Sequence, residues 1–341
     1  MTSVPKSLPR YAALLSLFLL LAGCSRSSQP KEIVYVAVPQ AYLRDRVAAV
    51  YNRVALVNNG DRLQVLEHSR RFLRVRTADR KEGWLEERYT VEQDVFDQVQ
   101  KLAADNLHTP VMATGLTDND TNIHTAPGRD SKHLYQIKGA TKVQILKRAT
   151  APKPGPAMVP VRENPAGKNS PPQPPLEDWW LVRDPQGRVG WVLARMVDID
   201  VPLEVAQYAE AQRIVGAFVL DQVQDGDNKV PQYLMVLTNP HDGMPYDYNQ
   251  IRVFTWNVKR HRYETAYRER NLFGVFPVTV THESFDKEGD LPVFILHVQD
   301  DSGKVVERKY KLNTPIVRRV LSPAEQAEMA AHPVRRPRRR R

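Results

Sequence analysis

Cysteine is almost absent from this chain: Cys24 is the only one among 341 residues. An exported protein normally uses its thiols in pairs, as disulfides. A single cysteine excludes any disulfide within the chain. It also leaves cysteine peptidases and L,D-transpeptidases only one side chain that could supply their thiolate nucleophile. The chemistry of Cys24 therefore decides whether thiol catalysis is open to this protein.

Other catalytic signatures are also missing. The nine histidines are scattered, no H-E-x-x-H motif occurs, and no G-x-S-x-G motif marks a serine nucleophile. Residues 118–122 begin like a calcium-binding loop, but Ile123 stands where the loop needs glycine and Arg129 where it needs glutamate. We therefore expect no metal, no cofactor and no catalytic residues. A glycosidase built on two carboxylates is the enzyme class that residue spacing leaves open.

The formal net charge of +10 is concentrated at the two ends of the chain. Lys6 and Arg10 lie near the N-terminus, and six of the last seven residues are arginines: Arg335, Arg336, Arg338, Arg339, Arg340 and Arg341. The rest of the chain carries only +2. A nucleic-acid-binding domain is expected to carry its cations on a folded face, so we expect no nucleic-acid partner. The arginine tail is either a solvated end or a site for an anionic surface.

The N-terminus is typical of a secretory signal. A short basic head precedes an apolar run from Tyr11 to Leu21, which is too short for a permanent membrane-spanning helix. The run ends in Leu21-Ala22-Gly23-Cys24, which resembles the lipobox of bacterial lipoproteins. That resemblance implies cleavage before Cys24, lipidation of its thiol and attachment to a membrane through acyl chains. In Gram-negative lipoproteins Ser25 implies the outer membrane, with the chain facing the periplasm. Lipidation also consumes the only thiol.

An internal repeat occupies the first two hundred residues. The first copy has Phe72-Leu73-Arg74-Val75-Arg76 and then, after six further residues, Gly83-Trp84-Leu85. At the same spacing, the second copy has Trp179-Trp180-Leu181-Val182-Arg183 and Gly190-Trp191-Val192. Upstream, Leu43-Arg44-Asp45 corresponds to Ile123-His124-Thr125. Alternating apolar residues between glycine-containing turns predict short antiparallel strands in two compact barrels.

This order of motifs resembles the bacterial SH3-like domain. The second copy fits its opening motif with Asn122-Ile123-His124 and Ala126-Pro127-Gly128, whereas the first copy lacks the Gly-Pro-Gly turn. The resemblance implies small β-barrels over residues 32–92 and 113–200. In the second copy we predict a ligand-binding surface at His124, Trp179 and Trp180.

The second copy carries a proline-rich insertion over residues 150–176. Proline removes hydrogen-bond donors, so this stretch cannot join the sheet and is expected to be extended. It is either a surface loop or a recognition tether centred on Pro171-Pro172-Gln173-Pro174. Between the copies, Thr90 is placed to cap a helix over residues 91–105, which belongs to a linker of residues 93–112.

Residues 201–321 predict a third domain, an antiparallel β sandwich or barrel of seven or eight strands that resembles no family. Separate strands are predicted over residues 262–267 and 275–280. Trp256 stands among arginines of one hairpin and is a candidate ligand-binding residue, although glutamates between them also fit a solvated strand face. The loop of His241, Asp242 and Asp247 fits either a cation or sugar site or a packed turn.

The predicted protein is therefore mostly β, with two SH3-like barrels, a third β domain and short linking helices. A signal (1–23) and a tether (24–31) precede the barrels, and a short helix with the basic tail (322–341) ends the chain. We expect a non-catalytic, lipid-anchored envelope protein that binds peptidoglycan or an envelope protein through its SH3-like domains. Two alternatives remain: a structural subunit of an envelope complex, or a wall hydrolase acting through the C-terminal β domain.

Overall fold

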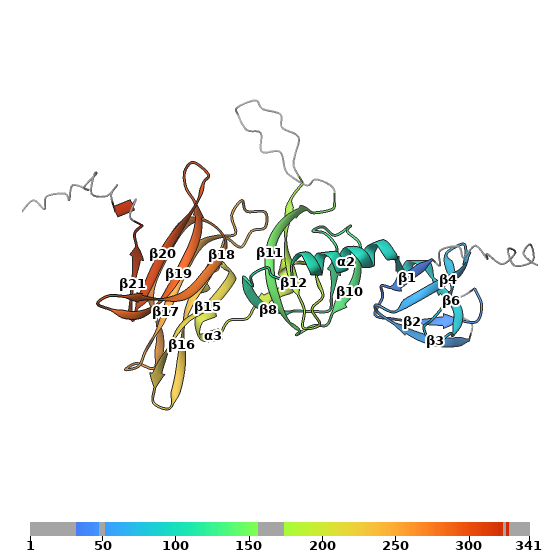
Figure 1. Ribbon diagram of the computed structural model, residues 1–341, viewed down its shortest axis with the longest axis horizontal. Helices are drawn as coiled ribbons and strands as arrows, with labels where there is room; N and C mark the ends of the chain where they lie inside the picture. Colours follow the sequence, from blue (N-terminus) through green and yellow to red (C-terminus); the bar gives the residue numbers. More distant parts are fainter. Residues whose placement is uncertain (1–31, 48–51, 156–173, 323–324, 327–341) are drawn as a thin grey trace, which may run out of the picture.

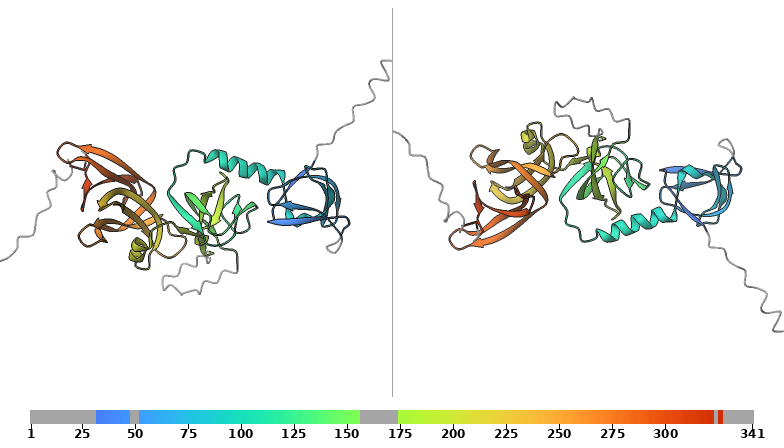
Figure 2. Two further views of the ribbon diagram at one scale, coloured as in Figure 1. Left: turned by 90° about the horizontal axis from the view of Figure 1, so that it is seen from below. Right: turned by 90° about the horizontal axis from the view of Figure 1, so that it is seen from above.

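The computed structural model describes residues 32–47, 52–155, 174–322 and 325–326. Cys24 with the signal and tether, the middle of the proline-rich insertion and the basic tail lie outside the described residues. The described chain is mostly β and forms three seven-stranded antiparallel sheets, which follow one another along the long axis of the molecule (Figure 1; Figure 2). The mostly β fold class predicted from the sequence is confirmed.

The first sheet has the strand order β3-β2-β6-β5-β4-β1-β7. Strict alternation builds its core: in β5, Leu73 and Val75 are buried while Arg74 faces solvent. Its elements are β1 (Ile33–Val36), β2 (Gln40–Arg44), β3 (Arg53–Asn58), β4 (Arg62–Ser69), β5 (Phe72–Arg76), β6 (Glu82–Glu86), the 3₁₀ turn η1 (Glu87–Tyr89) and β7 (Thr90–Glu92).

The second sheet repeats the first element by element, because its order β10-β9-β13-β12-β11-β8-β14 is the same order shifted by one repeat. Its elements are β8 (Ala113–Thr117), β9 (Thr121–His124), β10 (His133–Ile137), β11 (Lys142–Pro152), β12 (Leu176–Arg183), β13 (Val189–Leu193), η2 (Ala194–Met196) and β14 (Val197–Ile199). The prediction that residues 150–176 stay out of the sheet is wrong at both ends, because residues 150–152 extend β11 and pair with the start of β12. Arg44 lies opposite Trp84 in the first sheet, as His124 lies opposite Trp191 in the second. The sequence repeat is thus also a structural repeat, and we call the two units the first and second repeat.

Neither repeat is a closed barrel. Within the described residues, the ladder of each sheet runs between two end strands that do not pair with each other, β3 and β7 in the first repeat and β10 and β14 in the second. The short strand β1 pairs with both β4 and β7, so the ladder ends at β7 without reaching β3. Each repeat is therefore an open sheet with two edge strands, of which β3 or β10 lies beside β2 or β9.

The paired glycines of the repeat mark where two strands cross closely. A Cβ atom on Gly83 would lie 2.8 Å from Cβ of Leu43, and one on Gly190 would lie 2.1 Å from Cγ2 of Ile123. Both distances are shorter than side-chain contacts allow, so only glycine lets β6 lie against β2 and β13 against β9. The conserved spacing of these glycines within the chain therefore has a steric cause.

Helix α2 (Gln93–Asp105) joins the two repeats and packs against both. Val95 and Val99 are buried with Tyr35 of the first repeat and Leu134 of the second, while Leu102 and Ala103 pack near Trp191. The predicted start of this helix is wrong. Thr90 lies in β7, where it pairs with Val36, and its hydroxyl donates to the carbonyl oxygen of Glu87, so it does not cap α2. The helix begins two residues after the predicted Val91.

The third sheet is an uninterrupted meander, with β15 to β21 paired in sequence order. It is one sheet, and its end strands β15 and β21 are not paired within the described residues, so neither the predicted sandwich nor a closed barrel is formed. Its elements are α3 (Leu203–Ala206), η3 (Gln207–Ala209), β15 (Arg213–Asp225), β16 (Asn228–Thr238), β17 (Tyr248–Asn257), β18 (Arg262–Phe285), β19 (Gly289–Gln299), β20 (Val305–Asn313) and β21 (Ile316–Val320). The two strands predicted over 262–267 and 275–280 are parts of the single strand β18.

The third sheet and the second repeat share a continuous apolar core. Val215 and Leu220 of β15 belong to the same buried cluster as Met112, Ala113 and Val197 of the second repeat. Burial of this kind couples the two units, because separating them would expose apolar surface to water. No helix in the described part of the chain is long and apolar enough to cross a membrane.

Candidate functional site

The second repeat has a surface pocket where β9, β12 and β13 come together. Its volume is about 280 Å³, and it is lined by Asp120, Thr121, Asn122, His124, Arg129, Gln136, Trp179, Leu193 and Met196. Two of the residues predicted from the sequence, His124 and Trp179, meet in it. Their ring centroids are 5.2 Å apart and the ring planes are nearly perpendicular, at 77°.

His124 offers this pocket a hydrogen-bond acceptor. Its Nδ1 lies 3.0 Å from the carbonyl oxygen of Ser131. A carbonyl oxygen only accepts, so Nδ1 donates and Nε2 keeps its lone pair in the neutral ring. Burial lowers the pKa of His124 below its ordinary value of 6.5, and the neighbouring His133 adds to the lowering. His124 is therefore neutral at neutral pH, and within the described part of the chain only its Nδ1 is hydrogen-bonded.

Trp179 is a buried donor without a partner. Its side chain is 2% exposed, and its Nε1–H makes no hydrogen bond to any described residue. An unsatisfied buried N–H group costs about 1–3 kcal/mol, so such groups in native structures call for an explanation. The pocket thus combines a neutral acceptor, Nε2 of His124, with a tryptophan whose unpaired Nε1–H is itself buried.

The charged residues at the rim are already neutralised. Arg129 donates two hydrogen bonds, at 2.7 and 2.6 Å, to the buried Glu177, and these hold the pKa of that carboxyl below its ordinary value. Asp120 accepts from Lys138 at 2.9 Å and from the backbone N–H of Gly139, which lowers its pKa as well. This pocket of the second repeat, which we call the second pocket, therefore suits a neutral polar group.

The first repeat has a pocket at the corresponding place. Its volume is about 350 Å³, and it is lined by Val38, Gln40, Ala41, Tyr42, Arg44, Phe72, Trp84, Leu85, Glu86 and Tyr89. Seven of these positions match lining positions of the second pocket: Gln40 with Asp120, Ala41 with Thr121, Tyr42 with Asn122, Arg44 with His124, Phe72 with Trp179, Glu86 with Leu193, and Tyr89 with Met196. This pocket is richer in aromatic side chains than the second. Sequence reasoning missed it, although aligning the two copies pairs Phe72 with Trp179.

The other two predicted residues lie elsewhere. Trp180 is buried in the core on the opposite face of β12 from Trp179, because neighbouring residues of a strand point to opposite faces. Trp256 is in the third sheet, where its Nε1–H donates to Asp225 at 2.8 Å and its ring packs edge-on against Tyr263. Trp179 and His124 therefore share one site, while Trp180 and Trp256 do not join it.

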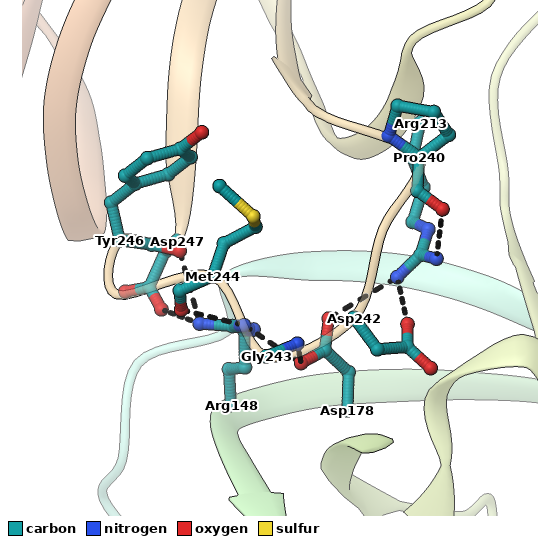
Figure 3. Close-up of polar contacts among 9 residues, drawn as sticks. All are labelled: Arg148, Asp178, Arg213, Pro240, Asp242, Gly243, Met244, Tyr246 and Asp247. Carbon is teal, nitrogen blue, oxygen red and sulfur yellow. Dashed lines mark hydrogen bonds and ion pairs between the residues drawn. The ribbon is translucent and has the colours of Figure 1, made fainter. Parts of the chain in front are cut away.

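The loop that carries Asp242 and Asp247 connects two domains (Figure 3). Arg148 of β11 donates to Asp178 at 2.7 Å and to Asp247 at 3.3 Å, and Arg213 of β15 donates to Asp178 and Asp242. The loop backbone takes part: the N–H of Gly243 donates to Asp178, and the carbonyl oxygens of Met244 and Tyr246 accept from Arg148. These carboxylates are already satisfied by arginines, so the packed-turn interpretation of this loop fits the structure.

No group of three or more His, Cys, Asp or Glu side chains is placed to hold a metal ion in the part of the chain that the structure describes. The fold and the pockets define a mostly β protein with two equivalent, pocket-bearing repeats and a third sheet joined to the second repeat.

Comparisons with known proteins add little to that description. No protein-family model matches the chain, and no curated protein matches it. Among solved structures, it is similar to NlpC2 from Trichomonas vaginalis, at 10% identity over 86% of this chain and 97% of that chain, with a TM-score of 0.18. It is also similar to an NlpC/P60 family protein from Bacillus cereus, at 10% identity over 83% and 95% of the two chains, with a TM-score of 0.23. TM-scores this low carry no inference about fold or activity.

His124 in the second pocket and its neighbour His133 predict that the protein is sensitive to acid. Burial lowers the pKa of His124 and of His133, so between their folded-state pKa values and 6.5 the unfolded chain binds more protons than the folded one. The free energy of unfolding should therefore fall as the pH drops below about 6.5. We expect urea unfolding at about pH 5.5 and about pH 7.5 to show a smaller acid-induced loss in His124→Asn and His133→Asn than in the unmodified protein.

His68 is the matched control, because its shift has the opposite sign. Its hydrogen bond to Glu32 raises the pKa of His68, so this pair adds stability below pH 6.5 that is lost as the pH rises. His68→Gln should therefore enlarge the loss on acidification. If the free energy of unfolding of His124→Asn and of His133→Asn depends on pH as it does in the unmodified protein, the prediction is wrong.

Proposed function

We propose that this chain is a non-catalytic envelope protein, anchored by lipid on Cys24, whose two repeats bind peptidoglycan through their equivalent pockets. The outer membrane, with the chain facing the periplasm, is the proposed location. The resemblance of residues 21–24 to a lipobox supports the lipid anchor, and the resemblance of the repeats to SH3-like domains supports the type of binding domain.

The observation that carries the proposal is the recurrence of a pocket at seven equivalent positions in two repeats that differ in most of those residues. A void left by imperfect packing has no reason to recur at the same place when its lining changes. A retained hollow lined by aromatic and polar side chains is the usual form of a binding site.

The chemistry of the pockets fits a wall polymer made of sugars and peptides. An amide group carries an N–H donor, which complements the acceptor Nε2 of His124. The aromatic faces of Tyr42 and Phe72 in the first pocket offer flat apolar surfaces against which a sugar ring can stack. Both groups occur repeatedly along peptidoglycan, so two pockets on one chain gain from binding together.

Co-sedimentation with purified peptidoglycan sacculi tests this function. We expect residues 25–341 to pellet with sacculi at about 0.05 M salt and still at about 0.5 M salt, because neutral pockets are little affected by screening. The double variant Phe72→Ala, His124→Ala should lower the bound fraction about tenfold, the effect of about 1.4 kcal/mol. His282→Ala, an exposed histidine outside both pockets, is the matched control and should bind normally.

A second experiment distinguishes binding through the pockets from binding through the arginine tail. A chain ending at residue 321 should keep the salt-resistant binding, since it keeps both pockets. Binding that disappears at high salt, or together with residues 322–341, would assign it to Arg335–Arg341 and contradict the pocket proposal. Protein that stays in the supernatant throughout would favour an envelope protein as the ligand.

A further inference from the structure

The edge strand of the second repeat is covered by the rest of the chain. A bulge between His133 and Tyr135 in β10 turns Leu134 outward, where it is fully buried among Tyr35, Val95 and Val99. The side chain of Asn59 closes the backbone edge: its Nδ2 donates to the carbonyl oxygen of Leu134 at 2.7 Å, and its Oδ1 accepts from the N–H of Gln136 at 3.3 Å. Covering of this kind protects an edge strand from unwanted pairing.

The same strand of the first repeat has the same geometry, but no described part of the chain covers it in this way. In β3, Ala55 lies opposite Leu43 and Arg53 opposite Arg44, so the bulge falls at Val54, the counterpart of Leu134. Val54 is 39% exposed and its neighbour Leu56 is 45% exposed. Tyr42 and Val47 add two more exposed large apolar side chains to this hairpin. We call Arg53, Val54 and Leu56 the β3 face.

We propose that the β3 face binds an amphipathic helix of a partner protein, in the way that α2 covers β10. The second repeat shows what such a helix needs. It presents two aliphatic residues one turn apart, as Val95 and Val99 do around Leu134. It also carries an acidic residue in its first turn, because Asp94 lies 3.5 Å from Lys132 beside β10. On the first repeat the register places Asn52 at the position of Lys132, and the adjacent Arg53 is the cation of the β3 face that this acidic residue would meet.

No segment that the structure describes takes this role on β3. Helix α2 already lies between the repeats, and residues 25–31 contain no aliphatic side chain. The C-terminal strand β21 lies at the opposite end of the elongated molecule from β3, so the residues after it start far from this face (Figure 1). The helix therefore belongs to another molecule. This proposal goes beyond the pocket function, since Val54 lines neither pocket.

Photo-crosslinking in the native envelope tests the proposal. A photoreactive amino acid replaces Leu56 in the full-length protein, and the cross-linked peptide is identified by mass spectrometry. We expect a peptide of another protein with aliphatic residues at i and i+4 and an acidic residue in the preceding turn. The same probe at Val305, which is also 45% exposed but lies in the third sheet, is the matched control and should give no such adduct.

Second-site variants show whether the adduct depends on the β3 face. Val54→Glu should lower its yield about tenfold, and Val54→Leu should preserve it, because only the first places a charge against the apolar face of the helix. Arg53→Glu provides an independent variant that reverses the charge facing the helix. A cross-linked peptide from a second copy of this chain, an adduct with lipid or peptidoglycan, or a yield at position 56 no higher than at 305 would each overturn the proposal.

Discussion

Asp178→Ala is expected to lower the free energy of unfolding by about 3 kcal/mol and to uncouple the third sheet from the second repeat. Asp178 is buried and accepts from Arg148, Arg213 and the backbone N–H of Gly243. Arg148 is itself only 9% exposed, so removing the carboxylate leaves a buried guanidinium with two backbone carbonyl oxygens and Asp247, at 3.3 Å, as its only remaining carboxylate partner. Breaking a buried ion pair costs more than the pair contributes, because the remaining charge stays desolvated.

Urea unfolding followed by tryptophan fluorescence and by circular dichroism measures this effect. The unmodified protein should lose the second repeat and the third sheet in one transition, whereas Asp178→Ala should separate them into two. Asp79→Ala is the control, because Asp79 and its partner Lys81 are both more than half exposed and such surface pairs contribute at most about 1 kcal/mol. Equal losses in Asp178→Ala and Asp79→Ala would show that the buried cluster does not couple the domains.

Leu134→Ala is expected to cost about 3 kcal/mol, while the same truncation at its counterpart, Val54→Ala, should cost less than about 1 kcal/mol. The two residues occupy the same bulge position, but Leu134 is buried between the repeats and Val54 is exposed. Truncating Leu134 leaves a cavity against Val95 and Val99, and the lost contacts add to the lost transfer free energy.

Thermal and urea denaturation of the two variants provide the measurement. Protease digestion should in addition cut Leu134→Ala within α2 more readily, because this helix loses one of its packing partners. A loss in Val54→Ala as large as that in Leu134→Ala would mean that Val54 is buried in solution, either by another part of the chain or by self-association. That outcome would also remove the basis for an open β3 face.

Local pattern was enough to predict the repeat and its strands. The positions of Trp84 and Trp191 after glycine, and the alternation in residues 72–76, reflect requirements of a single strand and its nearest neighbour. Such requirements are visible in sequence because side chains alternate along a strand, and because a close strand crossing admits only glycine. The mostly β fold class followed from the same local signals.

Two predictions from the sequence were wrong because contacts with residues distant in the chain determine the local conformation. Separate strands were predicted over residues 262–267 and 275–280, yet Glu269 between them accepts from Tyr267, Arg308 and Tyr310, and β18 continues through it. Thr90 has the features of a helix cap, but pairing with β1 holds it in a strand. In both cases a partner more than thirty residues away decided the conformation, and no local pattern shows such a partner.

In the candidate site, too, the sequence identified some residues, while the contacts between them depend on the tertiary structure. His124 and Trp179 could be singled out from their motifs, but the pocket that joins them needs strands β9 and β12 brought together across more than fifty residues. Asp242 and Asp247 looked like a possible ion site until the structure placed Arg148 and Arg213 against them. Charge compensation over such distances depends on how the domains pack, and the sequence of the loop alone does not show that packing.

By itself, the sequence determined that this protein has one cysteine, two copies of one β unit and a third β segment, because these are properties of composition, spacing and alternation. Only the tertiary structure decided that both copies keep a pocket at the same place, that an arginine–aspartate cluster joins the second copy to the third sheet, and that β10 is covered while β3 is open. These features arise between segments far apart in the chain, where burial and charge pairing are set by the packing of whole units.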